Sequence, residues 1–280
     1  MIIIAECGAT RSDWYLVESG TVRYCTSRPG LNFSTMSPEY ISEISNDALE
    51  ELRSRACSPV TSVHIYAAGV VYPQEQMHLI ENSVFRTFRD ATLELQSDIL
   101  AAARAVCGHS HGVAAILGTG SASCLYDGEK VVRQIASGGF ILGDEGSGAR
   151  LGRMFLSDFI KGLVPEDLAR GFADAFPSDY PAIVKNVYGK DGSPSGYLGS
   201  FAPFLLSHYG HPYVKTLIDR NFRDFFERVV RLYNTDKIGL VGGFAHAAAD
   251  IIAEIAKEYG VKISAIVKSP IELLAGFHKS

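Results

Sequence analysis

Two short stretches rich in glycine and hydroxyl residues stand at matching places in the two halves of the sequence. The first is "AECGATRSDW" (residues 5–14) and the second is "LGTGSASCL" (residues 117–125). Each joins two expected strands through small residues, and glycine permits the positive φ angles that turn successive backbone N–H groups toward one point. The side-chain hydroxyls that add further donors are those of Thr10, Ser12, Thr119 and Ser121. Either turn alone is typical of an ordinary hairpin, but their recurrence predicts two anion-binding turns.

A third stretch, "ASGGFILGDEGSGARLGRMF" (residues 136–155), combines many glycines with two adjacent carboxylates, Asp144 and Glu145. Ser147 and Gly148 are expected to begin a helix, and an acid at that end is favoured by the helix dipole. A capped helix explains Glu145 but not the density of glycine. A fourth stretch, "LVGGFAHAAAD", ends a strand at a glycine pair, which is typical either of close approach to a ligand or of strand–helix packing.

Asp98 lies where an apolar strand, residues 91–96, gives way to an alanine-rich helix. A carboxylate at such a junction caps the helix, accepts the proton of a reacting hydroxyl, or does both. Neither a P-loop pattern nor a G-x-G-x-x-G turn between strand and helix occurs in the chain. If nucleotide is bound, a different fold must bind it.

The elements that position these residues follow from hydrophobic patterning. Up to about residue 106 the pattern reads β-β-β-α-β-α-β-α, with Ser37 as the expected cap of the first long helix and residues 73–88 as the second helix. The second half opens with three strands again, continues through several helices to about residue 233, and ends in β-α-β-α, with the first of these two last helices expected over residues 244–260. This repeat of topology, without a repeat of sequence, predicts two similar α/β lobes.

Composition excludes several classes of partner. The 280 residues are 47% hydrophobic and carry a net charge of -5, which argues against nucleic acid and anionic membrane surfaces. The N-terminus lacks the basic region of a signal peptide, and no apolar run approaches a membrane span. Five scattered cysteines without a C-x-x-C pair fit a reducing compartment, so a cytoplasmic location is expected.

The order of "ECGATRSD", "LQSDILAAA", "LGTGS", "GGFILGDEGSG", "LVGGFA" and "SPIELLAGF" resembles the N-acetylglucosamine kinase family, over nearly the whole chain. That family belongs to the sugar kinase, Hsp70 and actin superfamily, in the branch that contains BadF/BadG-type reductase-activating ATPases. The resemblance implies an α/β fold with two actin-like, ribonuclease H-like lobes and a central cleft. Residues 1–106 would form the N-terminal lobe and 107–269 the C-terminal lobe, with a helix near 270–280 packing back on the first.

The resemblance also implies ATP-dependent phosphorylation of an amino sugar such as N-acetylglucosamine, at the 6-hydroxyl. Asp98 would be the catalytic base, and Glu6 would lie near the Mg²⁺ ion. Sugar contacts are implied for Asn32, Gly138, Gly139 and Asp144. ATP contacts are implied for Gly8, Thr10, Arg11, Gly118, Thr119, Gly120, Gly242 and Gly243. The partner is then a small-molecule amino sugar, with no nucleic acid and no membrane; a homodimer is left open.

The chain departs from the family pattern at Ala122 and at Ala67 and Ala68, where relatives carry polar residues. Because hydroxyl recognition depends on paired hydrogen bonds, these changes leave the identity of the sugar open. Two alternatives stand beside the kinase. One is a reductase-activator ATPase, disfavoured because its cluster-binding cysteine motif is missing and Cys124 lies within an expected strand. The other is a nucleotide or sugar sensor without turnover, which the presence of Asp98 disfavours.

Overall fold

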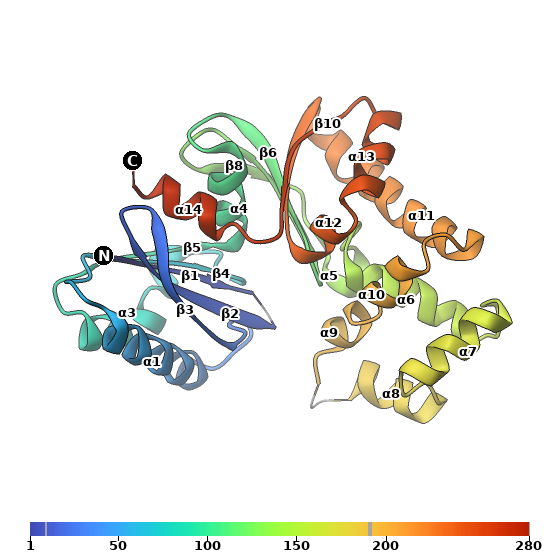
Figure 1. Cartoon of the computed structure of the whole chain (residues 1–280), viewed down its shortest axis with the longest axis horizontal. Coiled ribbons are helices and arrows are strands. Elements are labelled where there is room, and N and C mark those ends of the chain that lie inside the picture. The colour runs from blue at the N-terminus through green and yellow to red at the C-terminus, as the bar shows by residue number, and fades with distance from the viewer. Residues whose placement is uncertain (9, 190–191, 280) are drawn as a thin grey trace. The chain divides into compact units, whose positions relative to one another are not determined.

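The computed structural model describes residues 1–8, 10–189 and 192–279, and the chain divides into two compact units (Figure 1). The first unit comprises Met1–His109, Gly128–Lys130 and Pro270–Ser280, and the second comprises Ser110–Asp127 and Val131–Ser269. Each unit is built on a five-stranded mixed sheet with helices against it. The expected α/β fold class is therefore confirmed.

The first unit contains the first 109 residues of the chain and the last helix. Its elements are β1 (Ile2–Cys7), β2 (Arg11–Glu18), β3 (Thr21–Pro29), α1 (Pro38–Arg55), β4 (Ser62–Ala67), α2 (Pro73–Gln76), α3 (His78–Thr87), β5 (Thr92–Ser97), α4 (Asp98–Cys107) and α14 (Ile271–Phe277). The strand order in its sheet is β3-β2-β1-β4-β5. The first three strands form an antiparallel meander, and β4 and β5 run parallel to β1.

The second unit is longer because many helices separate its third and fourth strands. Its elements are β6 (Gly112–Leu117), β7 (Ser121–Tyr126), β8 (Val131–Gln134), α5 (Gly139–Leu142), α6 (Gly148–Phe159), α7 (Glu166–Ala175), α8 (Tyr180–Tyr188), α9 (Pro194–Gly199), α10 (Ala202–Ser207), α11 (Pro212–Arg228), the 3₁₀ helix η1 (Val230–Tyr233), β9 (Lys237–Val241), α12 (Gly243–Ala247), α13 (Ala249–Glu258) and β10 (Lys262–Val267). The strand order in its sheet is β10-β9-β6-β7-β8.

The two sheets share one topology. When β6 is matched to β1 and the other strands follow in sequence order, both sheets have the same neighbours and the same strand directions. In each sheet, numbered in sequence order, the first strand pairs with the second and the second with the third in antiparallel fashion. The first strand pairs with the fourth, and the fourth with the fifth, in parallel fashion. The predicted repeat of topology is confirmed.

Helices cover both faces of the first sheet (Figure 1). Alternate residues of β1, such as Ile3 and Cys7, face a core shared with α1 and α3, while Ile4 faces a second core with Leu274 of α14 and Ala101 of α4. Because successive side chains of a strand point to opposite faces, β1 is buried on both sides and reads as an unbroken apolar run. The helices thereby fix the end of β1, where the first glycine turn begins.

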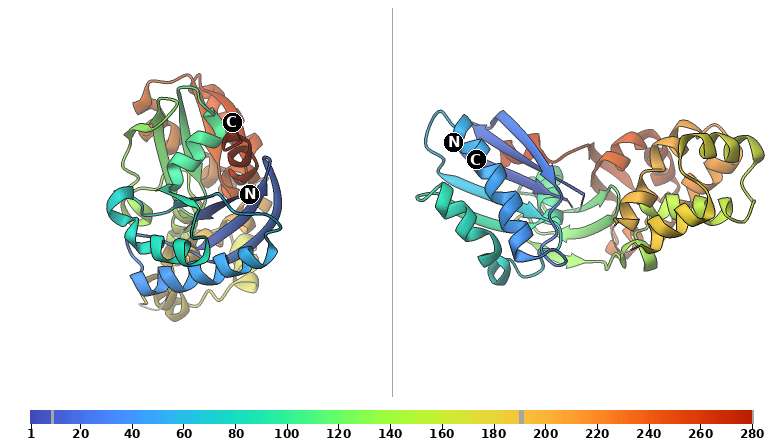
Figure 2. Two further views of the ribbon diagram at one scale, coloured as in Figure 1. Left: turned by 90° about the vertical axis from the view of Figure 1, so that its left-hand side faces the viewer. Right: turned by 90° about the horizontal axis from the view of Figure 1, so that it is seen from below.

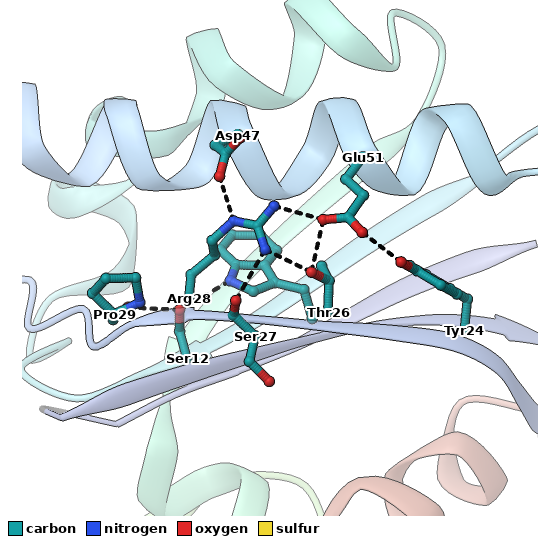
Figure 3. A network of polar contacts seen from close by, with 9 residues as sticks. Ser12, Tyr24, Thr26, Ser27, Arg28, Pro29, Asp47 and Glu51 are labelled. Carbon is teal, nitrogen blue, oxygen red and sulfur yellow. Dashed lines mark hydrogen bonds and ion pairs between the residues drawn. The ribbon is translucent and has the colours of Figure 1, made fainter.

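A polar network ties β3 to α1 on the first of these faces (Figure 3). Arg28 of β3 contacts both Asp47 and Glu51, which lie one helical turn apart on α1, and the contact to Glu51 is 2.6 Å. Tyr24 donates a hydrogen bond to Glu51, as does Thr26 at 2.8 Å. These bonds lower the pKa of Glu51 to about 2. The outer strand of the meander is therefore held by paired charges as well as by the core.

The helices between β8 and β9 gather beside the second sheet (Figure 2). Their buried side chains form a large core that is rich in phenylalanine. Phe172 of α7 contacts Phe155 and Phe201 edge-on, at ring-centroid distances of 4.8 and 5.0 Å. Burial of several phenylalanines, each worth about 2–3 kcal/mol, anchors this insertion. Within the described part of the chain, none of the helices has both the length and the apolar character that a membrane crossing requires.

Most expected elements are observed, but two of the expected helices are each divided into two. Ser37 caps α1 as predicted, accepting a hydrogen bond from the backbone N–H of Tyr40. The helix expected over 73–88 is two helices, α2 and α3, which meet at Met77. The helix expected over 244–260 likewise divides at Ala248, since α12 is a single short turn and α13 follows it.

Candidate active site

The first glycine turn connects β1 to β2. The backbone N–H of Gly8 donates to the carbonyl oxygen of Arg11 at 2.9 Å, which closes a tight turn around Thr10. Leu31, just past the end of β3, donates in turn to the carbonyl of Gly8 at 3.0 Å. Residue 9 lies outside the described residues. The turn is thus anchored by backbone bonds on both sides.

Ser12 does not contribute a donor to this turn. Its side chain is fully buried, and its hydroxyl donates to the carbonyl oxygen of Pro29 at 2.9 Å and accepts a hydrogen bond from the Trp14 indole N–H. The prediction that this hydroxyl is a phosphate donor was wrong, because strand alternation places Ser12 on the same buried face as Trp14. Arg11 points to the opposite face, where its guanidinium bonds to Asp13 at 2.8 Å and to Ser27.

Three carboxylates surround the end of β1. Burial raises the pKa of the Cys7 thiol, and nearby negative charges add to the shift; these belong to Glu6, Asp13 and Asp98. Glu6 and Asp13 are cross-strand partners, so their side chains share one face of the sheet. Carboxylate oxygens are the ligands that Mg²⁺ prefers, so this donor set fits a magnesium ion. Sequence analysis missed Asp13, although counting the hairpin register back from the turn identifies it.

Asp98 is the first residue of α4. The N-cap is Ser97, whose hydroxyl accepts from Leu100, while the Asp98 carboxylate accepts from the backbone N–H of Ile99 at 2.8 Å. The parallel register places Ser97 beside Ala67, which pairs with Cys7 on its other side. Burial raises the pKa of Asp98. The residue therefore joins the carboxylate group at the strand ends, as a better proton acceptor than an exposed aspartate.

Asn32 lies in a segment that bridges β4 and the first turn. It forms an isolated parallel bridge with Ala68, and its side-chain oxygen accepts a hydrogen bond from the backbone N–H of Ser34 at 3.0 Å. Gly69 packs so closely that an added Cβ would lie 2.2 Å from that oxygen. The Asn32 carbonyl group is therefore used by its own turn, and the amide nitrogen is the part of the side chain with donors to offer a ligand.

The second glycine turn is tied to the start of α6. The backbone N–H of Gly118 donates to the carbonyl of Gly120 at 3.0 Å. The carbonyls of Gly118 and Thr119 accept hydrogen bonds from the first N–H groups of α6, those of Gly148 and Ala149. The next N–H, that of Arg150, is capped by the Ser147 hydroxyl. The first N–H groups of α6 therefore have hydrogen-bond partners within the protein, and the bonds that Gly148 and Ala149 donate hold the glycine turn in position.

Asp144 joins the same assembly. Its carboxylate accepts a hydrogen bond from the backbone N–H of Ser121 and lies beside Gly120, where an added Cβ would be 3.3 Å from Oδ2. Its backbone has a left-handed φ of 55°, a conformation that aspartate tolerates better than most residues. The side chain is 6% exposed, and burial raises its pKa to about 6 despite the Ser121 hydrogen bond.

The glycines before Asp144 have local backbone reasons. Gly138 and Gly139 both adopt positive φ, and an added Cβ at Gly143 would lie 1.9 Å from the carbonyl oxygen of Ser137. The Asp144 N–H donates to that same carbonyl at 2.8 Å. A tight reversal of the chain therefore accounts for glycine density that a capped helix alone does not explain.

Asn221 of α11 holds this turn from behind, and sequence analysis missed it. The side chain is fully buried; its oxygen accepts from the Gly146 N–H at 3.2 Å, and its nitrogen donates to the Ser147 carbonyl at 3.0 Å. Arg150 of α6 makes a second bond to this helix, at 2.6 Å to Asp224. The signal in the sequence is an asparagine directly before Phe222, within the apolar stripe of α11.

Gly242 connects the fourth stretch to the second glycine turn. It has a φ of 127°, and an added Cβ would lie 2.5 Å from the carbonyl oxygen of Leu117, the last residue of β6. Gly243 begins α12, as expected of a glycine pair at a strand–helix junction. Within the second unit, the expected ATP-binding glycines therefore surround one strand end.

Searches against known sequences and structures bear on this arrangement. No family model matches the chain, and no curated protein matches it. A solved structure named "Putative N-acetylglucosamine Kinase", from Porphyromonas gingivalis, is 31% identical, with a TM-score of 0.92 over 100% of this chain and 99% of that one. The chain belongs to the N-acetylglucosamine kinase family. The resemblance inferred from the sequence motifs is thereby confirmed.

More distant structures share the fold of this family. One of the same name from Chromobacterium violaceum is 18% identical, with a TM-score of 0.76 over 99% of this chain and 98% of that one. A ROK family glucokinase from Streptomyces griseus, in complex with glucose and AMPPNP, is 16% identical, with a TM-score of 0.60 over 99% and 97% of the two chains. The actin-like architecture of sugar kinases therefore extends over the whole chain.

Proposed function

We propose that this protein transfers the γ-phosphoryl group of ATP to an amino sugar, N-acetylglucosamine, at its 6-hydroxyl. The observation that carries the proposal is the 31% identity, over the full length, to a protein named "Putative N-acetylglucosamine Kinase". The carboxylate and glycine groups described above supply the chemistry that such a reaction needs.

The glycine turns are proposed to bind the phosphates of ATP. Gly8, Thr10 and Arg11 would do so from the first unit, and Gly118, Thr119 and Gly120 from the second. Support comes from the rigid anchoring of both turns by backbone bonds, since preorganised N–H donors stabilise charge without reorganisation during the reaction. Gly242 and Gly243 are proposed to lie against the adenosine.

Asp98 is proposed as the catalytic base. As the sugar oxygen forms its bond to the γ-phosphorus, the bond from that phosphorus to the β–γ bridging oxygen breaks, and the hydroxyl proton passes to the Asp98 carboxylate. The products are the sugar phosphate and ADP. The burial that raises the pKa of Asp98 strengthens it as a proton acceptor.

Mg²⁺ fits the oxygen donors of Glu6 and Asp13. The ion would neutralise charge on the phosphates when bound. Arg11, which bonds to Asp13 at 2.8 Å, would hold that carboxylate in place.

The sugar is proposed to contact Asn32, Gly138, Gly139 and Asp144. The Asn32 amide nitrogen would donate to a sugar oxygen, and Asp144 would accept from a hydroxyl with the oxygen not held by Ser121. Ala67 and Ala68 offer no side-chain hydrogen bond, and Ala67 is fully buried. Specificity would therefore rest on few polar contacts.

The test is a coupled assay of ADP release with Mg²⁺ and ATP against N-acetylglucosamine, glucosamine, N-acetylmuramic acid and glucose. We expect the highest kcat/KM for N-acetylglucosamine, and ³¹P–¹H NMR of the product should show phosphate on C6. Tight binding of sugar without phosphate transfer would instead indicate a sensor. No ADP release above background with any of these sugars would overturn the proposal.

Asp98→Asn separates catalysis from helix capping. We expect kcat to fall by about 10²–10⁴-fold without a fall in melting temperature, because Ser97 provides the cap, asparagine retains an oxygen for the Ile99 N–H, and the change removes a buried charge. Asp90→Asn, in the exposed turn before β5, is the matched control and should leave both quantities unchanged.

A further inference from the structure

A second group of potential ligands lies on the face of the first sheet that α4 and α14 cover. His64 of β4 and Glu94 of β5 are register partners, and His278 follows the end of α14. One ligand atom from each of these three side chains lies within 4.8 Å of the others. Among the described residues, this is the one group in which three or more His, Cys, Asp or Glu side chains come so close together. His64 pairs with Ile4, two residues before Glu6, so the group is distinct from the carboxylates at the strand ends.

Each member of the group has one polar atom held by a neighbour. The His64 Nε2 is hydrogen-bonded to the Ser62 hydroxyl at 2.9 Å. The Glu94 Oε1 accepts from Arg104 at 2.8 Å, and the His278 Nε2 is 2.8 Å from the Tyr66 hydroxyl. Such partners on the far atom are what orient histidine and carboxylate ligands around a metal ion.

The ligand atoms lie close together. The His64 Nδ1 lies 2.7 Å from the Glu94 Oε2, and the ring of His64 lies against that of His278 with centroids 3.8 Å apart and 31° between the ring planes. Because the nitrogen lone pairs lie in the ring planes, the His278 ring must turn to reach an ion held by His64 and Glu94. Two imidazole nitrogens and one carboxylate oxygen form a donor set typical of zinc sites that keep an open position. We propose that His64, Glu94 and His278 bind a divalent transition-metal ion of the zinc class.

The carboxylate of the group lies between an imidazole and a guanidinium. The Glu94 Oε2 lies 2.7 Å from the His64 Nδ1, and the Glu94 Oε1 lies 2.8 Å from the Arg104 Nη1. Arg104 places a positive charge beside the site. We therefore expect a dissociation constant of about 1–10 μM, weaker than that of a closed four-ligand zinc site.

Binding requires that an ion reach the group from solvent and that the ligand atoms move to make room for it. His278 lines a surface cavity of about 220 Å³ together with Met1 and Val17, so this member of the group is reached from solvent. Zinc bonds of about 2.0–2.2 Å place ligand atoms roughly 3.2–3.5 Å apart, so the His64–Glu94 pair must open by less than about 1 Å. The ion would replace the hydrogen bond between these two side chains, and it would fasten α14 to the sheet.

The test is titration of Zn²⁺ into the full, tag-free chain after chelator treatment, with excess Mg²⁺ present to occupy oxygen-donor sites. We expect one Zn²⁺ per chain by calorimetry, and Co²⁺ should give visible absorption bands of a low-symmetry nitrogen–oxygen site. His278→Gln and His64→Gln should each weaken Zn²⁺ binding at least about 10-fold.

The matched control is His109→Gln. His109 stacks on Phe277 at 4.4 Å, next to the group but outside it, so its replacement should leave Zn²⁺ affinity unchanged. Far-UV circular dichroism without metal checks that each variant folds. Zn²⁺ uptake weaker than about 100 μM in the parent chain, or uptake that neither glutamine variant alters, would overturn the proposal. Both outcomes are independent of kinase activity.

Discussion

The side-chain nitrogen of Asn221 donates to the carbonyl oxygen of Ser147 at 3.0 Å, across 74 residues of sequence. The same amide accepts from the N–H of Gly146, so a single buried side chain satisfies two backbone groups of the turn that carries Asp144. An asparagine can bridge a donor and an acceptor in this way because its amide offers both. The helix α11 is therefore coupled to the candidate sugar-binding turn.

Replacement of Asn221 by alanine should destabilise this turn. Both hydrogen bonds are lost, and two buried backbone groups are left without their partner, which costs about 2–4 kcal/mol of unfolding free energy. Urea denaturation measures the loss, and the KM for sugar should rise in the same variant. Asn186→Ala removes an exposed asparagine that donates to the carbonyl of Ala182 within its own helix, α8, and should cost less than about 0.5 kcal/mol. Equal losses in the two variants would contradict the coupling.

Asp144→Asn should lower sugar kinase activity and raise the stability of the protein. Because burial raises the native pKa of Asp144 to about 6, above the unfolded value near 4, the native state binds the extra proton between these values. Stability from this group is present below about pH 4 and is lost as the pH rises through about 6. Asparagine removes the buried charge, so the variant should gain up to about 3 kcal/mol at pH 7.5, and nothing at pH 4.

Thermal melts across this pH range measure the stability of the variant, and sugar kinase assays at pH 7.5 measure its activity. Asp174→Asn, at an exposed position of α7, is the control and should shift neither. A variant that is less stable than the parent at pH 7.5 would show that the Asp144 charge has a stabilising partner, against the argument from burial.

Gly242→Ala tests the contact between the two glycine stretches of the second unit. The new Cβ would lie 2.5 Å from the Leu117 carbonyl, at a φ of 127° that disfavours alanine. We expect a loss above about 2 kcal/mol and weaker ATP binding. Gly260→Ala introduces positive-φ strain with no atom within 4 Å of the new Cβ, so it isolates the strain from the clash. If the two variants lose the same stability, close packing at Gly242 is not the reason for glycine there.

How far the sequence predicts this molecule depends on the range of the interaction. Strand alternation and glycine punctuation predict both meanders and the repeated topology, because these patterns are local. The burial of Ser12 also follows from alternation, once Trp14 is taken as the core residue. Two details of the helices differ from the prediction at single positions. One is the break between α2 and α3 at Met77, and the other is the N-cap of α4, which is Ser97 and not Asp98. At such positions neighbouring residues have similar propensities to end or cap a helix.

Partners distant in the sequence could not be predicted in the same way. Asn221 is one polar residue in an apolar stripe, and only the packing of α11 shows which turn it meets. Asp13 needs the hairpin register, and the group of His64, Glu94 and His278 needs α14 to return to the first sheet. In each case the residue type is ordinary, and tertiary packing gives it a role.

Asp13→Asn should change the dependence of activity on Mg²⁺. Asp13 and Glu6 are cross-strand partners among the carboxylates around Cys7, so loss of one anionic oxygen group lowers the affinity for a hard cation. We expect the Mg²⁺ concentration for half-maximal activity to rise about 10-fold, with a smaller change in the KM for sugar. Asp47→Asn, which removes one of the two carboxylates that Arg28 contacts on α1, controls for the loss of one aspartate and should leave the Mg²⁺ dependence unchanged. If Asp13→Asn and Glu6→Gln both retain the Mg²⁺ dependence of the parent, the ion is held elsewhere.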